Sequence, residues 1–165
     1  MISSNYYYAA STIRSGLDRA IRNVADNIAF YCTDPGFAFT RNRKMGAKDL
    51  MYFLLQLTDK SINSDLMNRY ASFEEMPKAS AICQQRYKLD SSAMRRVFHE
   101  FTYSFKNYKT YKGYHLLACD GSDINICHNP KDKDTYYLPT YATKGFNQLH
   151  LNALYDVLNN IYQEV

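Results

Sequence analysis

Apolar residues recur at helical spacing through the first part of the chain. One face of an α-helix over about 12–31 is formed by Ile13, Leu17, Ile21, Val24 and Ile28, with charged residues on the other face. Four further helices are predicted in the same way, over about 47–58, 63–73, 78–87 and 91–106. The chain up to about residue 112 is therefore expected to be mainly helical.

The ends of these helices are marked by residues that cap or break helices. Ser11 or Thr12 is placed to cap the first helix, and the Asp-Pro-Gly sequence at 34–36 is placed to end it. Asp90 is predicted to cap the last helix, with Leu89 and Met94 on either side for a hydrophobic staple. The buried stripe of that helix is expected at Met94, Val97, Phe98, Phe101 and Phe105.

The hydrophobic pattern changes from helical to strand-like near Gly113. The apolar run at 116–119 is too short for a helix and Gly121 is expected to stop it, which predicts a strand over 114–120 ending at Asp120. Residues 122–127 are predicted as a short strand or a turn, and 129–145 as a long loop without periodicity. Alternation over 148–158 and a further run at 161–165 predict two more strands, in an antiparallel sheet.

These patterns predict an α+β chain in two parts. The first, 1–112, is a helical part, and the second, 113–165, contains the strands. The polar, aromatic segment 107–113 is expected to mark the boundary between them. The length of 165 residues suits one domain, or one small domain with part of another, and the hydrophobic share of 46% argues against disorder.

The cysteines and the start of the chain bear on cellular location. No Cys-x-x-Cys pair is present, and Cys83 and Cys119 lie in apolar surroundings, so both are expected to be reduced and buried in a cytoplasmic protein. A zinc site that uses Cys127 and His128 is a weak alternative. The first eight residues lack the features of a signal peptide, and no apolar run approaches the ~18 residues that a membrane span needs.

Positive charge is concentrated in the helical part. The net charge is +4, but most Lys and Arg residues precede His115, and the remainder of the chain is acidic. Such a basic part suits binding to a polyanion, because Lys and Arg supply the sequence-independent part of DNA binding. The segment 37–45 combines aromatic and basic residues and is expected either to follow a phosphate backbone or to be a solvated loop. The predicted DNA-binding residues are Arg41, Arg43, Lys44, Arg86, Lys88, Arg95 and Arg96.

The predicted helices 78–87 and 91–106 are separated by only a short turn. The second presents Arg95 and Arg96 on its polar face. This is the layout of a helix-turn-helix DNA-binding motif, and it is also the layout of any two packed helices. Both interpretations stay open at the level of sequence.

Three segments together resemble a known family of enzymes. They are 80–89 (Ser-Ala-Ile-Cys-Gln-Gln-Arg-Tyr-Lys-Leu), 111–122 (Tyr-Lys-Gly-Tyr-His-Leu-Leu-Ala-Cys-Asp-Gly-Ser) and 147–156 (Asn-Gln-Leu-His-Leu-Asn-Ala-Leu-Tyr-Asp). In this order and at these distances they are similar to DDE-type insertion-sequence transposases of the IS-four group. The resemblance extends over roughly 39–165.

The resemblance implies a helical DNA-binding part followed by the opening antiparallel strands of an incomplete ribonuclease-H-like domain. In that family two Asp and one Glu hold two Mg²⁺ or Mn²⁺ ions that catalyse phosphodiester cleavage and strand transfer. Asp120 corresponds to the first carboxylate, and the other two have no counterpart in this sequence. Asp156 is the local substitute to consider, although a role at a hairpin end or a core edge is the expected one. Asp123 would face the other side of a strand that continued past Asp120.

The expected function is therefore that of a truncated, inactive transposase without bound metal. A non-catalytic DNA-binding protein, which binds the element's ends or inhibits intact transposase, is the alternative, and a helical interaction module is the third hypothesis. The expected partners are double-stranded DNA and a second copy or an intact transposase. The expected location is the bacterial cytoplasm, at the nucleoid.

Overall fold

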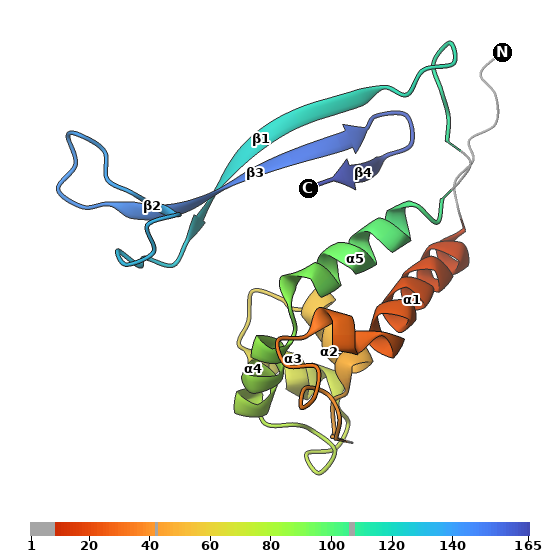
Figure 1. Ribbon diagram of the computed structural model, residues 1–165, viewed down its shortest axis with the longest axis vertical. Helices are drawn as coiled ribbons and strands as arrows, with labels where there is room; N and C mark the ends of the chain where they lie inside the picture. Colours follow the sequence, from red (N-terminus) through yellow and green to blue (C-terminus); the bar gives the residue numbers. More distant parts are fainter. Residues whose placement is uncertain (1–8, 42, 106–107) are drawn as a thin grey trace. The chain divides into compact units, whose positions relative to one another are not determined.

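Within the described residues, five α-helices precede an antiparallel four-stranded sheet, so the predicted α+β class is confirmed (Figure 1). The structure is a computed structural model that describes residues 9–41, 43–105 and 108–165. The start of the chain at 1–8, where a signal peptide was not expected, lies outside these residues. The chain divides into two compact units, Met1–Ser104 and Phe105–Val165.

The first helix, α1, spans Ala10–Asp26 and is followed by a 3₁₀ turn, η1, at Ile28–Tyr31. The predicted cap at Ser11 or Thr12 is wrong, because both residues lie inside the helix and Ala9 occupies the N-cap position without a side-chain hydrogen bond. The helix also ends well before the Asp-Pro-Gly sequence, at Asn27. A tighter turn then carries the chain onward, as is common at helix ends.

The remaining helices are α2 (Ala47–Leu55), α3 (Ile62–Arg69), α4 (Ala79–Lys88) and α5 (Ser91–Thr102). Three of them, α2, α3 and α5, end earlier than their apolar periodicity predicts. Lys106, the expected end of the last helix, lies outside the described residues. The cap predicted at Asp90 is confirmed, since its carboxylate accepts a hydrogen bond of 2.9 Å from the Ser92 backbone N–H.

Two apolar clusters form the core of the helical unit. The first joins α1, α2 and α5 through Ala20, Ile21, Val24, Met51, Ala93 and Val97. The second joins α2, α3 and α4 through Leu50, Phe53, Leu66 and Ile82, together with Met45 from the preceding loop. Accordingly α5 packs along α1, whereas α4 packs on α2 and α3.

The turn between α4 and α5 connects the two clusters. Leu89 packs against both of them. The backbone of the turn is fixed on each side of Leu89, because the Asp90 N–H donates to the Tyr31 carbonyl and the Thr33 N–H donates to the Lys88 carbonyl, each at 2.9 Å. The segment after η1 therefore holds the turn in place.

The sheet is built around β3 (Phe146–Asp156). β1 (Leu117–Ile126) pairs along one edge of β3, and β2 (Tyr136–Tyr137) and β4 (Ile161–Glu164) pair with opposite ends of its other edge (Figure 1). All three pairings are antiparallel, as predicted for the two that join β3 to β1 and β4.

Two details of the sheet differ from the sequence predictions. Gly121 does not end β1, because Gly121 pairs with Asn152 and the strand continues to Ile126. Asp120 therefore lies within the strand, opposite Ala153, and residues 122–126 continue the same strand. The segment predicted as a loop contains the two-residue strand β2, because Asn147 and Phe146 offer it backbone partners.

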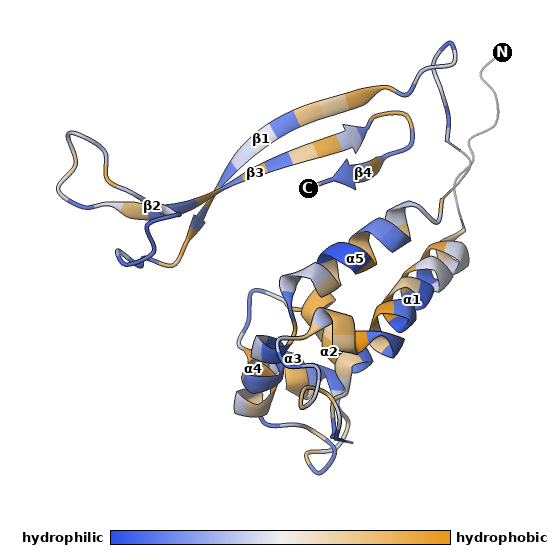
Figure 2. Cartoon of the chain, viewed as in Figure 1, coloured by the Kyte–Doolittle hydropathy of each residue, from blue (hydrophilic) through white to orange (hydrophobic). Residues whose placement is uncertain are grey.

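Both faces of β1 are exposed, and polar and apolar bands follow one another along β1 and β3 (Figure 2). Cys119 is exposed for this reason, so the prediction that it is buried is wrong, and Cys83 is only partly buried. All four cysteines are free thiols. Among the helices that the structure describes, none has the length and apolar character needed to cross a membrane.

Replacing Ile21 by Ala is expected to lower the free energy of unfolding of the helical unit by about 2–5 kcal/mol, because the substitution leaves a cavity in the first cluster. Ile13 lies on the same face of α1 but is 43% exposed, whereas Ile21 is fully buried. Ile13→Ala is therefore a matched control with an expected loss of about 0.5 kcal/mol or less. Denaturant unfolding followed by circular dichroism measures both, and equal losses would contradict the packing of α1.

Candidate nucleic-acid interface

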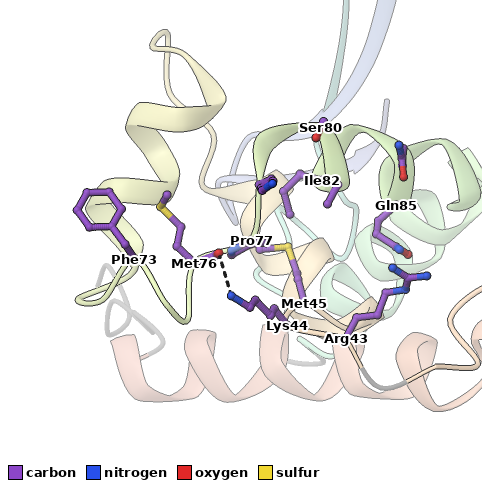
Figure 3. Close-up of a pocket in the computed structure, with 12 residues that line it drawn as sticks. Arg43, Lys44, Met45, Phe73, Met76, Pro77, Ser80, Ile82 and Gln85 are labelled. Carbon is purple, nitrogen blue, oxygen red and sulfur yellow. Dashed lines mark hydrogen bonds between the residues drawn. The ribbon is translucent and has the colours of Figure 1, made fainter.

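Two adjoining grooves lie where the loop at 37–46 meets α4. The larger has a volume of about 720 Å³ and is bordered by this loop, the segment 73–77 and α4 (Figure 3). The smaller, of about 240 Å³, lies between the same loop and the end of α4. Arg43, Met45 and Gln85 line both grooves, so the two are adjacent.

The loop is anchored by its small and apolar residues, which leaves its basic residues in solvent. The Phe37 and Ala38 N–H groups donate to the Asp34 carbonyl, and Ala38 is buried. Met45 is buried in the second cluster at the other end. Between these anchors, Arg41 and Arg43 are exposed.

Lys44 fixes the far wall of the larger groove. Its ammonium group donates to the Glu74 carbonyl and, at 3.5 Å, to the Met76 carbonyl (Figure 3). These hydrogen bonds hold the segment before α4 and place Phe73 at one end of the groove. Lys44 thus keeps its positive charge on the wall of the groove, and its hydrogen bonds support the shape of that wall.

Four of the seven basic residues predicted from the sequence come together here: Arg41, Arg43, Lys44 and Lys88. Lys78 also lines the larger groove, and sequence reasoning missed it. The sequence feature that could have identified Lys78 is its position just before α4, the helix that ends with the predicted DNA-binding residue Lys88. No Asp or Glu is found among the described residues that line the two grooves.

The other three predicted residues line neither groove. Arg86 lies over the ring of Tyr87, at 5.8 Å from the ring centre. Arg95 and Arg96 are exposed on α5, and Arg96 forms an ion pair with Glu100 at 2.7 Å that raises the pKa of the Arg96 guanidinium. The core residues of α5 belong to the first cluster and those of α4 to the second. The two helices therefore do not present their basic residues together, as a packed helix-turn-helix pair would.

Asp120 is exposed in the middle of β1. Its carboxylate accepts a hydrogen bond of 2.9 Å from the Gly121 N–H. Cross-strand pairing places it beside Ala153, on the same sheet face as Ser122 and Leu151.

Asp156 is fully buried and shapes the turn between β3 and β4. Its carboxylate accepts hydrogen bonds from the Leu158 and Asn159 N–H groups and from the Asn159 side chain, at 2.8–3.1 Å. The other oxygen lies 3.4 Å from Nδ1 of His115. These contacts agree with the hairpin-end role expected for this residue.

The structure does not bring Asp156 and Asp120 together. Asp156 is three positions along β3 from Ala153, the partner of Asp120, so the two carboxylates point to opposite faces of the sheet. Among the described residues, no three His, Cys, Asp or Glu side chains converge, and this includes Cys127 and His128. Two divalent ions need several converging oxygen ligands, so the residues described here do not fit the two-metal site that the family resemblance implies.

Asp123 forms a different constellation on the face opposite Asp120. Its carboxylate lies 2.7 Å from Nδ1 of His150, and this hydrogen bond raises the pKa of the imidazole above its usual 6.5. Gly121 leaves room for the ring, because a Cβ atom at this position would lie 3.1 Å from it. The pair joins β1 to β3 and is a structural contact between neighbouring strands.

Comparisons of the chain with family models, curated proteins and solved structures found no match. The resemblance to DDE-type transposases therefore rests on the residues of the three segments alone.

Asp123→Asn is expected to lower the pKa of His150 towards its ordinary value, because it removes the charged hydrogen-bond partner. Because the pKa of His150 is raised, the pair stabilises the fold fully at pH values below the ordinary pKa of histidine. This contribution is lost as the pH rises through the raised pKa. An NMR titration of the His150 ring measures the change. Asp134→Asn, at an exposed carboxylate in the loop, is the matched control, and an equal shift in both variants would contradict the pairing.

Proposed function

We propose that the helical unit binds DNA, and that the chain is a helical DNA-binding part joined to the opening strands of a ribonuclease-H-like core of a DDE-type transposase. The observation that carries DNA binding is the clustering of Arg41, Arg43, Lys44, Lys78 and Lys88 along two adjacent grooves. The transposase assignment rests on the resemblance and on Asp120.

The physical basis of binding is the release of counterions from the DNA. Each Lys or Arg that neutralises a phosphate releases condensed cations, so the affinity falls steeply as the salt concentration rises. Arg41 and Arg43 lie in a loop whose backbone is held on either side of them, and both side chains line the grooves, where they can reach phosphates. Such contacts fix the orientation of the duplex and carry no base sequence information.

Two features of the sheet support the transposase assignment. Asp120 lies on β1, the strand to which the resemblance assigns the first catalytic carboxylate, and its side chain is exposed. The antiparallel order in which β3 lies between β1 and β4 suits the opening strands of a ribonuclease-H-like core. A bacterial cytoplasmic location at the nucleoid follows from the DNA partner as part of the proposal.

A non-catalytic DNA-binding protein that pairs with intact transposase, or with a second copy, is the second candidate. The observation in its favour is the outer edge of β1, since within the described residues β1 pairs only with β3. An exposed strand edge offers backbone groups to a strand of another chain. Both candidates share the DNA-binding grooves.

Replacing Arg41 and Arg43 together by Ala is expected to weaken binding to duplex DNA at every sequence tested. The slope of the logarithm of the binding constant against the logarithm of the salt concentration should become shallower by about one for each lost phosphate contact. Fluorescence anisotropy over a salt series measures both quantities. The matched control is the double variant Arg14→Ala and Arg19→Ala, which removes two exposed charges from α1, outside the grooves. Equal losses in both variants would show that net charge alone determines binding.

Replacing Arg95 and Arg96 together by Ala tests whether α5 shares in the contact. We expect a loss of affinity for duplex DNA, because both guanidinium groups are exposed on one helix. Unchanged affinity would remove α5 from the DNA-binding surface and confine that surface to the two grooves.

We expect this 165-residue chain alone to show no metal-dependent cleavage or strand transfer, because one exposed carboxylate cannot hold two divalent ions. The assay uses purified protein, DNA that carries the end of the element, and Mg²⁺ or Mn²⁺. Cleavage that disappears in an Asp120→Ala control would contradict the expectation. In a protein that also supplies the two missing carboxylates, Asp120→Ala should abolish strand cleavage.

A further inference from the structure

Each of the two grooves carries one phenylalanine that is not part of the core. Phe73 lines the larger groove and is 75% exposed, and Phe37 lines the smaller one and is 79% exposed. The backbone beside both rings is held, since the Phe37 N–H donates to the Asp34 carbonyl and Lys44 binds the carbonyl of Glu74, which follows Phe73. Exposed aromatic rings have apolar faces available to a ligand.

The charged residues that line the two grooves are all basic. Arg43 lines both grooves, and Figure 3 shows it at the end of the larger groove opposite Phe73. Lys78 contributes to the larger groove, and Arg41 and Lys88 to the smaller. A ligand complementary to this surface has several negative charges with flat apolar groups beside them.

We propose that the two grooves bind an unpaired stretch of DNA, with bases stacked on Phe37 and Phe73 and the phosphate between them on Arg43. The inference rests on the proposed DNA-binding function and specifies the form of the DNA. In a duplex the faces of the bases are covered by their neighbours, so a phenylalanine ring has no base to stack on. In a single strand each base offers a face, and stacking on aromatic side chains beside a basic groove is how such strands are bound without sequence preference. The larger groove, at about 720 Å³, is large enough to enclose a flat ring system.

An acidic peptide with apolar side chains shares some of this chemistry. The arrangement favours the nucleic acid, because each groove combines one exposed ring with basic residues, and Arg43 lines both grooves. A peptide partner is therefore an outcome against which the inference is tested.

The test compares three probes with the full chain by fluorescence anisotropy. They are an oligothymidylate of about ten nucleotides, within the usual site size of about 4–16, a duplex of equal length, and a polyglutamate peptide of similar charge. The variants are Phe37→Ala, Phe73→Ala and Phe73→Tyr. Phe30→Ala is the matched control, because Phe30 is 81% exposed and lines neither groove.

Each groove variant, Phe37→Ala or Phe73→Ala, should weaken binding of the oligothymidylate about tenfold and leave duplex binding within about twofold. Phe73→Tyr should keep the affinity, since a tyrosine ring stacks as well, and Phe30→Ala should have no effect. Unchanged oligothymidylate binding in both Ala variants, with duplex binding intact, would overturn the inference and leave the proposed function standing. Binding of polyglutamate as tight as that of the oligothymidylate would also overturn it. Failure to bind any DNA would refute the proposed function itself.

Discussion

The helical unit depends on the two-residue turn at Leu89 and Asp90. Leu89 is the residue that packs against both apolar clusters, and the backbone around it is bound to the segment that follows η1. The turn therefore holds the end of α4 against the segment 31–33, which leads into the loop at 37–46 that borders the grooves. The two grooves thus lie beside the point where the two small cores are joined.

The sheet is held together in a different way. Its most buried residues are polar: Asn147 bonds to the backbone of Asn129 and to the Thr135 hydroxyl, and Asp156 bonds to the turn before β4. Buried polar groups with satisfied hydrogen bonds specify one arrangement of the chain around them. They fix the loop and the hairpin, while the faces of β1 stay exposed. Asp120 is exposed, and it lies on the sheet face opposite Asp123 and Asp156.

The sequence predicted the elements whose signals are local. The periodicity of Ile21 and Val24 identified α1, and Asp90 identified the start of α5, because helical spacing and capping depend only on near neighbours. The end of β1 was misplaced at Gly121 because glycine usually weakens strands. Gly121 stays in the strand because it pairs with Asn152 and because the His150 ring lies against the space that a Cβ atom would fill. Both residues belong to a strand that is distant in the sequence.

The candidate site was predictable in its composition and less so in its geometry. Arg41, Arg43 and Lys44 stand out in the sequence because they follow two aromatic residues in a segment without periodicity. Their meeting with Lys78 and Lys88 depends on the packing of α4 on α2 and α3, which no short-range pattern reveals. The bond of Asp156 to Asn159 is short-range and agrees with the hairpin-end role predicted from the sequence, whereas its contact with His115 joins residues that are distant in the sequence.

The central claim is that DNA lies in the two grooves of the helical unit. Photo-crosslinking with DNA that carries a reactive base analogue, followed by mass spectrometry of the linked peptides, tests it most directly. The account predicts crosslinks to the segments 37–46 and 73–88, on both sides of Arg43. Crosslinks confined to α1 or to the sheet would contradict it.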